Sequence, residues 1–455
     1  MHQRLLSKDL PRHKSFCLLG ADGVGKTTLI RDFAGKFSNW IHLDLTVESD
    51  RSIFRADSPA EETLKAVGFL KGKEIRGSGT LILLDEIGQC REAMDWVWDQ
   101  ADGRTGGRAD GRTGPLIVAT SSIRSEEIDQ LVNPANGPMA AYFLHPFSFE
   151  EFLMVMDDPA SLEAFREVPV PYYAYEKLLN YFHLYALIGG MPEITSEYAS
   201  SGNLSALKKI YEQAEERLIQ HLPLVTGGNK SQELAMEVLQ NSYPFAATRI
   251  SFNRFGNIEK GSREISRSLQ SLQQARLLQL IYPVTSPTLP VEPDKSKFPR
   301  LQLLDTGLVN YFSGIQKPLF QSHDMNAIFK GQIARQVVGQ ELLATQHLKH
   351  TDATQLSFWV RNKAQSGAEV DFVIRYNDLL IPVVVRSGEP GHLRSLHQFM
   401  DIAPHPYAVR LYAEKLSVQQ TRTLSGRKYY LLNLPYFLAG KIRDHLEGFM
   451  KYVEG

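Results

Sequence analysis

Short apolar runs alternate with helix-periodic segments through the first third of the chain. The runs cover residues 15–19, 41–45, 81–84 and 115–120, and a segment with helical spacing fills 60–70. Strands and helices that alternate in this way favour parallel strand pairing with helices on the faces of the sheet. The pattern therefore predicts a doubly wound α/β domain at the N-terminus, with its ligand site at the carboxyl ends of the strands.

The middle of the chain has the spacing of helices. From residue 172 to 222 apolar residues recur at helical intervals with few breakers, which predicts an all-helical lid, assigned to residues 156–225. Helical patterns follow at 233–241 and 262–278, and a short strand pattern comes after them. This order is typical of a helix-turn-helix with a wing, so residues 226–315 are predicted to form a winged-helix domain.

The spacing in the second of these segments predicts a helix with an apolar face and a polar face. Ile265, Leu269, Leu272 and Ala275 share one side, which leaves Arg263, Arg267 and Gln270 facing outward. Basic residues on a recognition helix are candidates to contact the backbone or the bases of DNA. A solvated face, or a face packed on a neighbouring domain, is an equal alternative.

Three apolar runs near the C-terminus, at 356–360, 368–374 and 380–386, indicate consecutive strands, and a helical segment follows at 393–400. Such a mixture predicts a further α/β domain over residues 316–455. The N-terminal sheet domain then occupies residues 1–155.

Composition narrows the class of protein. A chain of 455 residues is too long for one core and suggests about three domains of ordinary size. The formal net charge of −1 argues against a broadly basic surface, so any contact with nucleic acid has to come from local patches. Cys17 and Cys90 lie in or beside predicted core strands without metal-ligand spacing, which predicts buried free thiols. No segment has the length of a signal peptide or membrane span, so we expect a cytoplasmic protein without a membrane partner.

A glycine-rich loop connects the first predicted strand with the first helix. The run reads Gly20, Ala21, Asp22, Gly23, Val24, Gly25, Lys26, Thr27, Thr28 and fits the full Gly-x-x-x-x-Gly-Lys-[Ser/Thr] pattern. Backbone N–H groups of such a loop and the helix N-terminus bind phosphate oxygens. We expect Lys26 to reach the β- and γ-phosphates and the Thr27 hydroxyl to complete the shell of a Mg²⁺ ion.

Two carboxylates end the third apolar run. In Leu81 to Glu86 we expect Asp85 to bind the shell of the metal ion and Glu86 to activate the attacking water as general base. The next run ends in hydroxyl residues, and either Ser121 or Ser122 is a candidate to sense the γ-phosphate. The sequence does not choose between the two serines.

A tandem duplication separates the helix after Glu86 from the following strand. Ala101 to Arg108 is repeated in shortened form at 109–114, and the segment has no large apolar residue. We interpret it as a tolerated flexible insertion. The alternative makes Arg104, Arg108 and Arg112 a phosphate-contacting finger.

Four further motifs carry a family resemblance. The segment His145 to Phe152 contains a capping box, with Ser148 as N-cap and Glu151 at the third helical position. With Leu83-Leu-Asp-Glu-Ile87, Ile188-Gly-Gly-Met-Pro-Glu193 and Leu304-Asp-Thr-Gly-Leu308, the chain resembles a large prokaryotic family of AAA-type ATPases. In that family a P-loop domain is fused to a winged helix and a C-terminal restriction-endonuclease-like domain, and the resemblance covers nearly the whole chain.

The resemblance implies ATP binding at residues 20–28, with Asp85 and Glu86 as the hydrolytic pair and a lid turn at Gly189 and Gly190. The family often has Gly-Arg where this chain has Gly137 and Pro138. If that arginine reads the γ-phosphate, this chain lacks the usual one.

The C-terminal strands resemble a PD-(D/E)xK nuclease core, in which an Asp faces a Glu-x-Lys and a helix Glu completes a Mg²⁺ site. Here Asp371 matches the Asp, but Val384 stands at the Glu position, Arg386 at the Lys position and Arg335 at the helix Glu position. An arginine stays protonated and cannot act as a base. Glu369 shares a face with Asp371 and is a candidate to rescue a weak metal site. Because the other positions of the motif hold a valine and two arginines, we predict a degenerate nuclease without activity.

Two interpretations of this degenerate site are open. In one, Arg335 and Arg386 turn a former metal cleft into a phosphate pocket that holds nucleic acid without cutting it. In the other, Asp371 pairs with Arg386 across the strands, and the domain is kept for folding or for docking a protein partner.

The sequence as a whole predicts a multidomain ATPase. ATP and Mg²⁺ are the expected ligands, and hydrolysis would drive a conformational switch in the attached winged-helix and nuclease-like domains. The alternatives are a nucleotide-gated DNA-binding module with negligible turnover and, as a third interpretation, an ATP-dependent nuclease.

Overall fold

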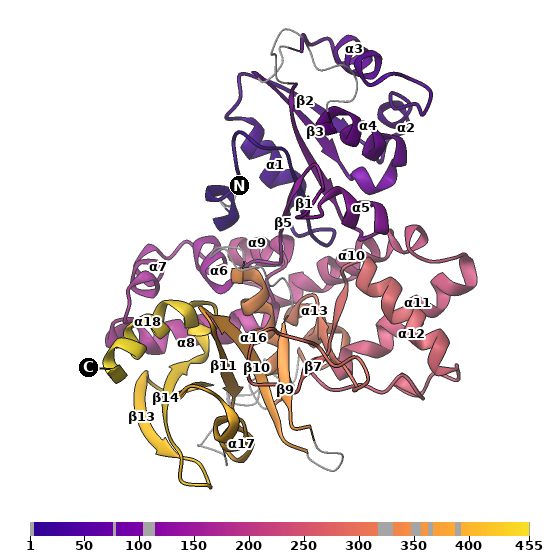
Figure 1. Ribbon diagram of the computed structural model, residues 1–455. Helices are drawn as coiled ribbons and strands as arrows, with labels where there is room; N and C mark the ends of the chain where they lie inside the picture. Colours follow the sequence, from indigo (N-terminus) through magenta and orange to yellow (C-terminus); the bar gives the residue numbers. More distant parts are fainter. Residues whose placement is uncertain are drawn as a thin grey trace.

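A computed structural model describes residues 4–75, 79–102, 114–316, 331–346, 356–362, 367–386 and 393–454. The N-terminal domain lies at the top of Figure 1, the lid helices run across the middle, and the C-terminal sheet lies below them. The elements of the N-terminal domain are η1 (Leu5–Lys8), β1 (Phe16–Leu19), α1 (Lys26–Ala34), β2 (Asn39–Asp44), α2 (Glu48–Arg51), α3 (Ala60–Lys71), β3 (Thr80–Asp85), η3 (Ile87–Gln89), α4 (Arg91–Asp102), β4 (Leu116–Ser121), α5 (Glu126–Leu131) and β5 (Ala140–Phe143).

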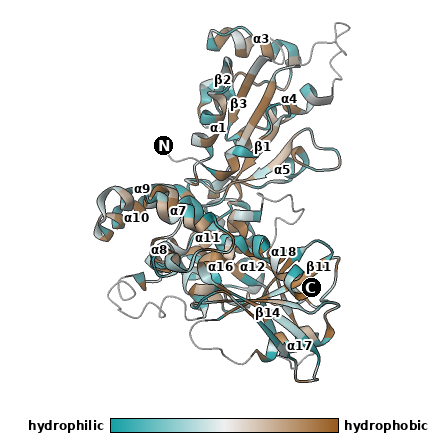
Figure 2. Cartoon of the chain, turned by 90° about the vertical axis from the view of Figure 1, so that its left-hand side faces the viewer, coloured by the Kyte–Doolittle hydropathy of each residue, from teal (hydrophilic) through white to brown (hydrophobic). Residues whose placement is uncertain are grey.

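The N-terminal sheet has the order β2-β3-β4-β1-β5, and all of its neighbouring strands are parallel. Alternate strand residues enter two different cores, since Phe16 and Leu18 pack with α1, whereas Cys17 and Leu19 pack with α4 and α5. Figure 2 shows β3, in the middle of this sheet, mostly in the brown of hydrophobic residues, as expected where helices cover both faces. The predicted α/β fold is confirmed, and β5 is a strand that the sequence pattern did not predict.

The lid consists of helices that follow the sheet. Its elements are α6 (Phe149–Val155), α7 (Pro159–Arg166), η4 (Tyr172–Ala174), α8 (Tyr175–Ile188), α9 (Pro192–Ser201), η5 (Leu204–Ala206), α10 (Leu207–Ile219) and η6 (Leu222–Leu224). The predicted capping box begins α6: the Ser148 hydroxyl accepts the N–H of Glu151, and the Glu151 carboxylate accepts the N–H of Ser148. Both bonds satisfy donors that the first turn of a helix leaves free.

The next segment contains helices and a small antiparallel ribbon. Its elements are α11 (Asn229–Ser242), η7 (Tyr243–Phe245), η8 (Phe255–Asn257), α12 (Ser262–Gln274), β6 (Leu278–Ile281), β7 (Pro283–Val284), β8 (Arg300–Leu303) and α13 (Thr306–Phe312). Strands β6 and β8 pair antiparallel, and the apolar face predicted for α12 is buried.

The C-terminal elements are α16 (Gln332–Gln346), β9 (Ser357–Val360), β10 (Glu369–Tyr376), β11 (Leu379–Val385), α17 (Arg394–Ile402), β12 (Tyr407–Tyr412), β13 (Ser417–Arg422), β14 (Lys428–Pro435), η10 (Tyr436–Lys441) and α18 (Ile442–Glu454). They form a mixed sheet of order β13-β14-β12-β11-β10-β9-β7. The edge strand β7 pairs parallel with β9, although it comes from the preceding segment. A boundary at residue 315 therefore does not separate two independent folding units.

Three of the sequence motifs meet in one buried polar cluster. The Asp305 carboxylate accepts the N–H of Gly190 at 2.6 Å, and the N–H of Phe147 donates to the carbonyl of Gly190 at 2.7 Å. A Cβ on Gly189 would lie 2.1 Å from an Asp305 oxygen, so the predicted lid turn requires glycine here. From α16, Glu341 accepts the N–H of Phe149 at 2.8 Å. The cluster ties the lid to the C-terminal domain.

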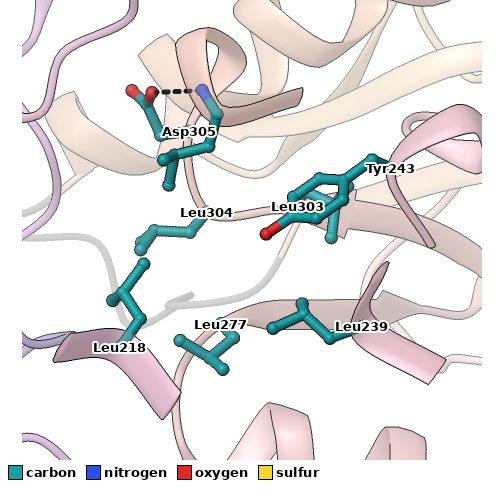
Figure 3. A pocket seen from close by; sticks show the side chains of 8 residues that line it. Leu218, Leu239, Tyr243, Leu277, Leu303, Leu304 and Asp305 are labelled. Atoms are coloured by element: carbon teal, nitrogen blue, oxygen red, sulfur yellow. Dashed lines mark hydrogen bonds between the residues drawn. The ribbon is translucent and has the colours of Figure 1, made fainter. Parts of the chain in front are cut away.

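Apolar side chains surround one side of this cluster. The Asp305 carboxylate also accepts the N–H of Leu308 at 3.1 Å. Figure 3 shows Asp305 next to a small pocket between the lid and α11. The pocket is lined by Leu218, Leu239, Tyr243, Leu277, Leu303, Leu304 and Leu308. Burial raises the pKa of Asp305 to about 6 and that of Glu341 to about 8. These acids are therefore structural groups in a dry interior.

Both cysteines are buried free thiols, as predicted. Burial raises the pKa of Cys17 to about 12, which makes its thiol unreactive at neutral pH. Within the described ranges, no helix combines the length and the hydropathy that crossing a bilayer requires.

Candidate nucleotide site

The glycine-rich loop leaves β1 and enters α1, at the carboxyl edge of the sheet. A Cβ on Gly20 would lie 2.4 Å from the carbonyl oxygen of Leu144, so the loop can pass there only without a side chain. Gly25 caps α1 in the left-handed region, at φ 95°. The N-terminus of a nine-residue helix therefore points into a loop with the shape of a phosphate cradle.

Lys26 begins α1 and lies among three polar partners. Its Nζ donates to the Ser122 Oγ at 2.6 Å and to the Ala21 carbonyl at 3.1 Å, and it lies 3.2 Å from the Glu86 Oε1. Glu86 follows β3 with a left-handed φ of 56° and accepts both the Ser122 N–H at 2.9 Å and the Ser122 hydroxyl at 2.7 Å. The lysine and the acid predicted from separate motifs are thus brought into direct contact.

The two candidate serines have different surroundings. The Ser121 hydroxyl donates to the carbonyl of Ile123 at 2.9 Å and so closes a local turn. The Ser122 hydroxyl contacts both Lys26 and Glu86. Of the two serines, Ser122 is therefore the one that lies beside the predicted lysine and acid, one residue after the end of β4.

Asp85 has a separate set of partners. Its Oδ1 accepts the Thr120 hydroxyl at 2.5 Å, and its Oδ2 lies 3.5 Å from the Nε2 of His42. Burial raises the pKa of Asp85, but the neighbouring side chains of His42, Thr120 and Thr27 outweigh it, so the pKa is lowered overall. A carboxylate that stays ionised beside the Thr27 hydroxyl fits a Mg²⁺ shell, and these two residues are the ones that would hold the ion.

Sequence reasoning missed several residues of this site, among them His42 and Arg4. His42 comes from β2, and only the pairing of β2 with β3 brings it to Asp85. Arg4, before the first strand, donates to the carbonyl of Val24 at 2.7 Å and to that of His145 at 2.7 Å, and it pairs with Glu151 at 2.9 Å. No local pattern marks either residue, since their partners are distant in the sequence.

The lid contacts the phosphate loop directly. The side chain of Met191 lies 3.1 Å from the place of a Cβ on Gly23, and that of Pro192 lies 3.9 Å from the place of a Cβ on Gly25. His221 lies 3.6 Å from a carboxylate oxygen of Asp22. The loop is therefore covered by the turn that the Gly189-Gly190 motif makes.

Around Asp371, where the sequence predicts a degenerate nuclease site, the structure has a network of cations. The Asp371 Oδ2 accepts the Val385 N–H at 2.8 Å and the Arg386 guanidinium at 2.9 Å, and Arg335 lies 3.8 Å from the Oδ1. The pairing of Asp371 with Arg386, one of the two sequence interpretations, is confirmed. Arg335 and Arg386 thus already have an anionic partner.

Two details of this site differ from the sequence interpretation. Val384 packs with Val370, Leu396 and Phe399 beneath α17, whereas Val383 and Val385 belong to the other face of the sheet. The expectation that Val384 fills the metal-ligand position beside Asp371 is therefore wrong. Arg300, which the sequence did not single out, pairs with Glu369 and donates to the Asp371 carbonyl. The Glu369 carboxylate is thus already paired with an arginine.

Three of the residues predicted to contact nucleic acid lie on the surface of α12. Arg263, Arg267 and Gln270 are exposed, as the helical pattern predicts. The arginines of the duplicated segment, Arg104, Arg108 and Arg112, lie outside the described residues. In the described part of the chain, no group of three or more His, Cys, Asp or Glu residues is placed to hold a metal ion on its own.

Comparison with known proteins supports the assignment of the first domain. Residues 12–153 match the model of an AAA domain, and residues 179–319 and 330–436 match two domains of unknown function, DUF8612 and DUF4143. No curated protein matches the chain. The sheet order, the phosphate loop and the AAA match together show that the N-terminal part is an AAA-type P-loop ATPase domain.

Solved structures with similarity to the chain have low sequence identity. The Walker-type ATPase of Pyrococcus abyssi is 13% identical, with 68% of this chain and 92% of that one covered and a TM-score of 0.40. The Aeropyrum pernix ORC1 protein in complex with DNA is 11% identical, with 68% and 88% covered and a TM-score of 0.30. RuvB of Thermotoga maritima is 13% identical, with 60% and 84% covered and a TM-score of 0.28.

Proposed function

We propose that the chain binds ATP with Mg²⁺ at the glycine-rich loop and hydrolyses it. The rearrangement of the loop on hydrolysis would then move the attached domains. The observation that carries this proposal is the contact of Lys26 with Glu86 and Ser122, next to Asp85. The lysine cation and the loop N–H groups would bind the phosphates. Mg²⁺, held through Thr27 and Asp85, would neutralise charge that develops on the phosphate oxygens.

Glu86 is the general base in this proposal. Its carboxylate is held by the Ser122 N–H and hydroxyl and reaches Lys26 only at 3.2 Å, so bound phosphate can take over the lysine and leave Glu86 to a water molecule. Ser122 then lies between the base and the γ-phosphate, where it orients the water. Lys26→Ala and Glu86→Gln test these two roles.

The switch would travel through the contacts of the lid. The loop meets Met191 and Pro192, and the neighbouring Gly190 is bonded to Asp305, which α16 in turn contacts through Gln340 at 3.3 Å. A rearrangement at the phosphate loop therefore has a continuous packed route to the C-terminal domain.

We further propose that the C-terminal domain does not cleave nucleic acid. A two-carboxylate Mg²⁺ site needs free acids, and here Asp371 and Glu369 are each paired with arginine. We expect the purified protein to leave supercoiled plasmid intact in Mg²⁺ or Mn²⁺, with and without ATP. Nicking that is lost in Asp371→Ala would overturn this part of the proposal.

Asp371→Ala should instead lower stability. Removal of the carboxylate leaves Arg386 and Arg335 without their anion in a largely buried position, at a cost of about 2 kcal/mol once their partial exposure is allowed for. Urea unfolding should show the loss, whereas Asp378→Ala at an exposed turn should be neutral. An unchanged midpoint for Asp371→Ala would show that the ion pairs do not support the domain.

A nucleotide-gated DNA-binding module is the second candidate function, with residues 226–315 as a winged helix. The exposed Arg263 and Arg267, one turn apart on α12, favour it. The double variant Arg263→Glu/Arg267→Glu should weaken binding to duplex DNA. The slope of log affinity against log salt concentration should decrease in magnitude by about two. Arg12→Glu/Lys14→Glu, with the same charge change on the exposed start of the ATPase domain, is the control. Equal losses in both variants would leave α12 without a specific role.

A further inference from the structure

An acidic residue lies inside the phosphate cradle. Asp22 is part of the glycine-rich loop, and its Oδ1 accepts the N–H of Gly23 at 2.8 Å. Backbone N–H groups of such loops are the donors that phosphate oxygens use. A carboxylate at this position adds negative charge where a triphosphate, which is itself negative, has to bind. The charge of Asp22 therefore opposes phosphate binding unless a cation pairs with this carboxylate.

His221 of the lid meets this acid. It lies at the junction of α10 and η6, with its Nε2 3.6 Å from the Asp22 Oδ2 and its Nδ1 3.5 Å from the amide Nε2 of Gln89. Its side chain is 14% exposed and that of Asp22 is 32% exposed. One imidazole thus joins the phosphate loop, the turn after the Asp85-Glu86 strand and the lid.

The charges around His221 favour its protonated form. The neighbouring Asp22 carboxylate raises the pKa of His221, burial opposes the rise, and Glu86 supports it against the repulsion of Lys26. For Asp22, burial raises the pKa, but the neighbouring His221 and the charge of Lys26 outweigh it, so the pKa is lowered. A protonated His221 would face the Asp22 carboxylate through its Nε2, and the Gln89 amide would turn its oxygen toward Nδ1, because the amide nitrogen is itself a donor.

We propose that His221 is a positioning residue for the nucleotide, which as a cation neutralises Asp22 in the phosphate cradle and so couples closure of the lid to the affinity for triphosphate. This inference rests on the proposed ATP site and adds to it the residue through which the lid makes an electrostatic contact with the loop. The apolar contacts of Met191 and Pro192 fix the lid against the loop, and His221 supplies the charge.

The sign of the pH dependence follows from the raised pKa of His221. The cation is present at low pH and is lost as the pH rises through that raised pKa, so its contribution to ATP affinity should disappear in the same direction. Between about pH 5 and pH 8 we expect the affinity of the full-length protein for a fluorescent ATP analogue to fall about tenfold.

Three variants isolate the pair. His221→Asn should bind the ATP analogue weakly even at low pH, as the wild type does at high pH. Its affinity should therefore fall less with rising pH than that of the wild type. Asp22→Asn should bind tightly at high pH. The double variant should resemble Asp22→Asn, because removal of the acid makes the cation unnecessary. His13→Asn, at an exposed position before β1, is the matched control and should follow the wild type.

The comparison between variants removes other titrations. The phosphates of the probe titrate in every variant, so only the difference from wild type reports on His221. A His221→Asn protein with the wild-type profile would overturn the inference, as would a failure of Asp22→Asn to restore its binding. Rescue by Asp22→Asn also excludes simple misfolding of His221→Asn.

The same measurements separate this inference from the proposed function. If the wild type binds no nucleotide, or if Lys26→Ala binds as well as wild type, the ATP site itself is refuted. If binding depends on Lys26 but not on His221, only the coupling through the lid is refuted.

Discussion

Lys26→Ala should abolish ATP binding at ordinary concentrations. The Lys26 ammonium is almost fully buried at the start of α1, and the other basic side chains near the loop are already paired with acids, Arg4 with Glu151 and His221 with Asp22. Truncation of one member of a buried charge pair costs roughly 2 to 5 kcal/mol, which is at least about 30-fold in affinity. Equilibrium binding of a fluorescent ATP analogue to the full chain measures the loss.

The matched control for this variant is Lys14→Ala, an exposed lysine that precedes β1 in the same domain. It should bind like the wild type. Loss of the Lys26 ammonium also leaves Glu86 without its cation, so thermal unfolding of the variant should be compared in the absence of nucleotide. A folded Lys26→Ala protein with wild-type affinity would show that the nucleotide binds elsewhere.

Glu86→Gln should keep ATP bound and stop its hydrolysis. The amide retains the size of the side chain and the left-handed backbone of this position but cannot take a proton from water. Loss of a general base typically lowers the rate by about 10² to 10⁴. Because the glutamine also releases Lys26 from its ion pair, the affinity for ATP should hold or increase. Single-turnover hydrolysis and ATP retention on the protein measure the two effects.

Glu126→Gln, an exposed acid on α5, is the control for this variant and should turn over ATP normally. Equal turnover in Glu86→Gln and wild type would contradict the assignment of the base. Weak binding in Glu86→Gln would contradict the idea that Glu86 and phosphate compete for Lys26.

The parts of the site that sequence predicted are those set by local geometry. The spacing from Gly20 to Thr27 describes one turn between a strand and a helix, and the Asp85-Glu86 pair ends a single strand, so each motif carries its own structural context. The parallel sheet then follows from the alternation of elements. The place where the glycine-rich loop meets the Asp85-Glu86 pair could be predicted, because the carboxyl ends of parallel strands share one edge of the sheet.

The parts that sequence missed depend on contacts between distant segments. Arg4 and His221 reach the loop from outside the sheet, and nothing in their neighbouring residues marks them. The error at Val384 has a different origin. The pairing of β9 with β10 is irregular between Val370 and Val373, so Asp371 lies in a bulge where the simple alternation of faces fails.

The crossing of β7 into the C-terminal sheet decides where the chain can be divided. A fragment that starts at residue 316 would lack Pro283 and Val284, which cover β9, and Arg300, which neutralises Glu369. Its open strand edge would invite association with other copies, and an acid would be left uncompensated. A fragment with the complete C-terminal sheet therefore has to begin before residue 283, and it then includes β8, the strand that pairs with β6.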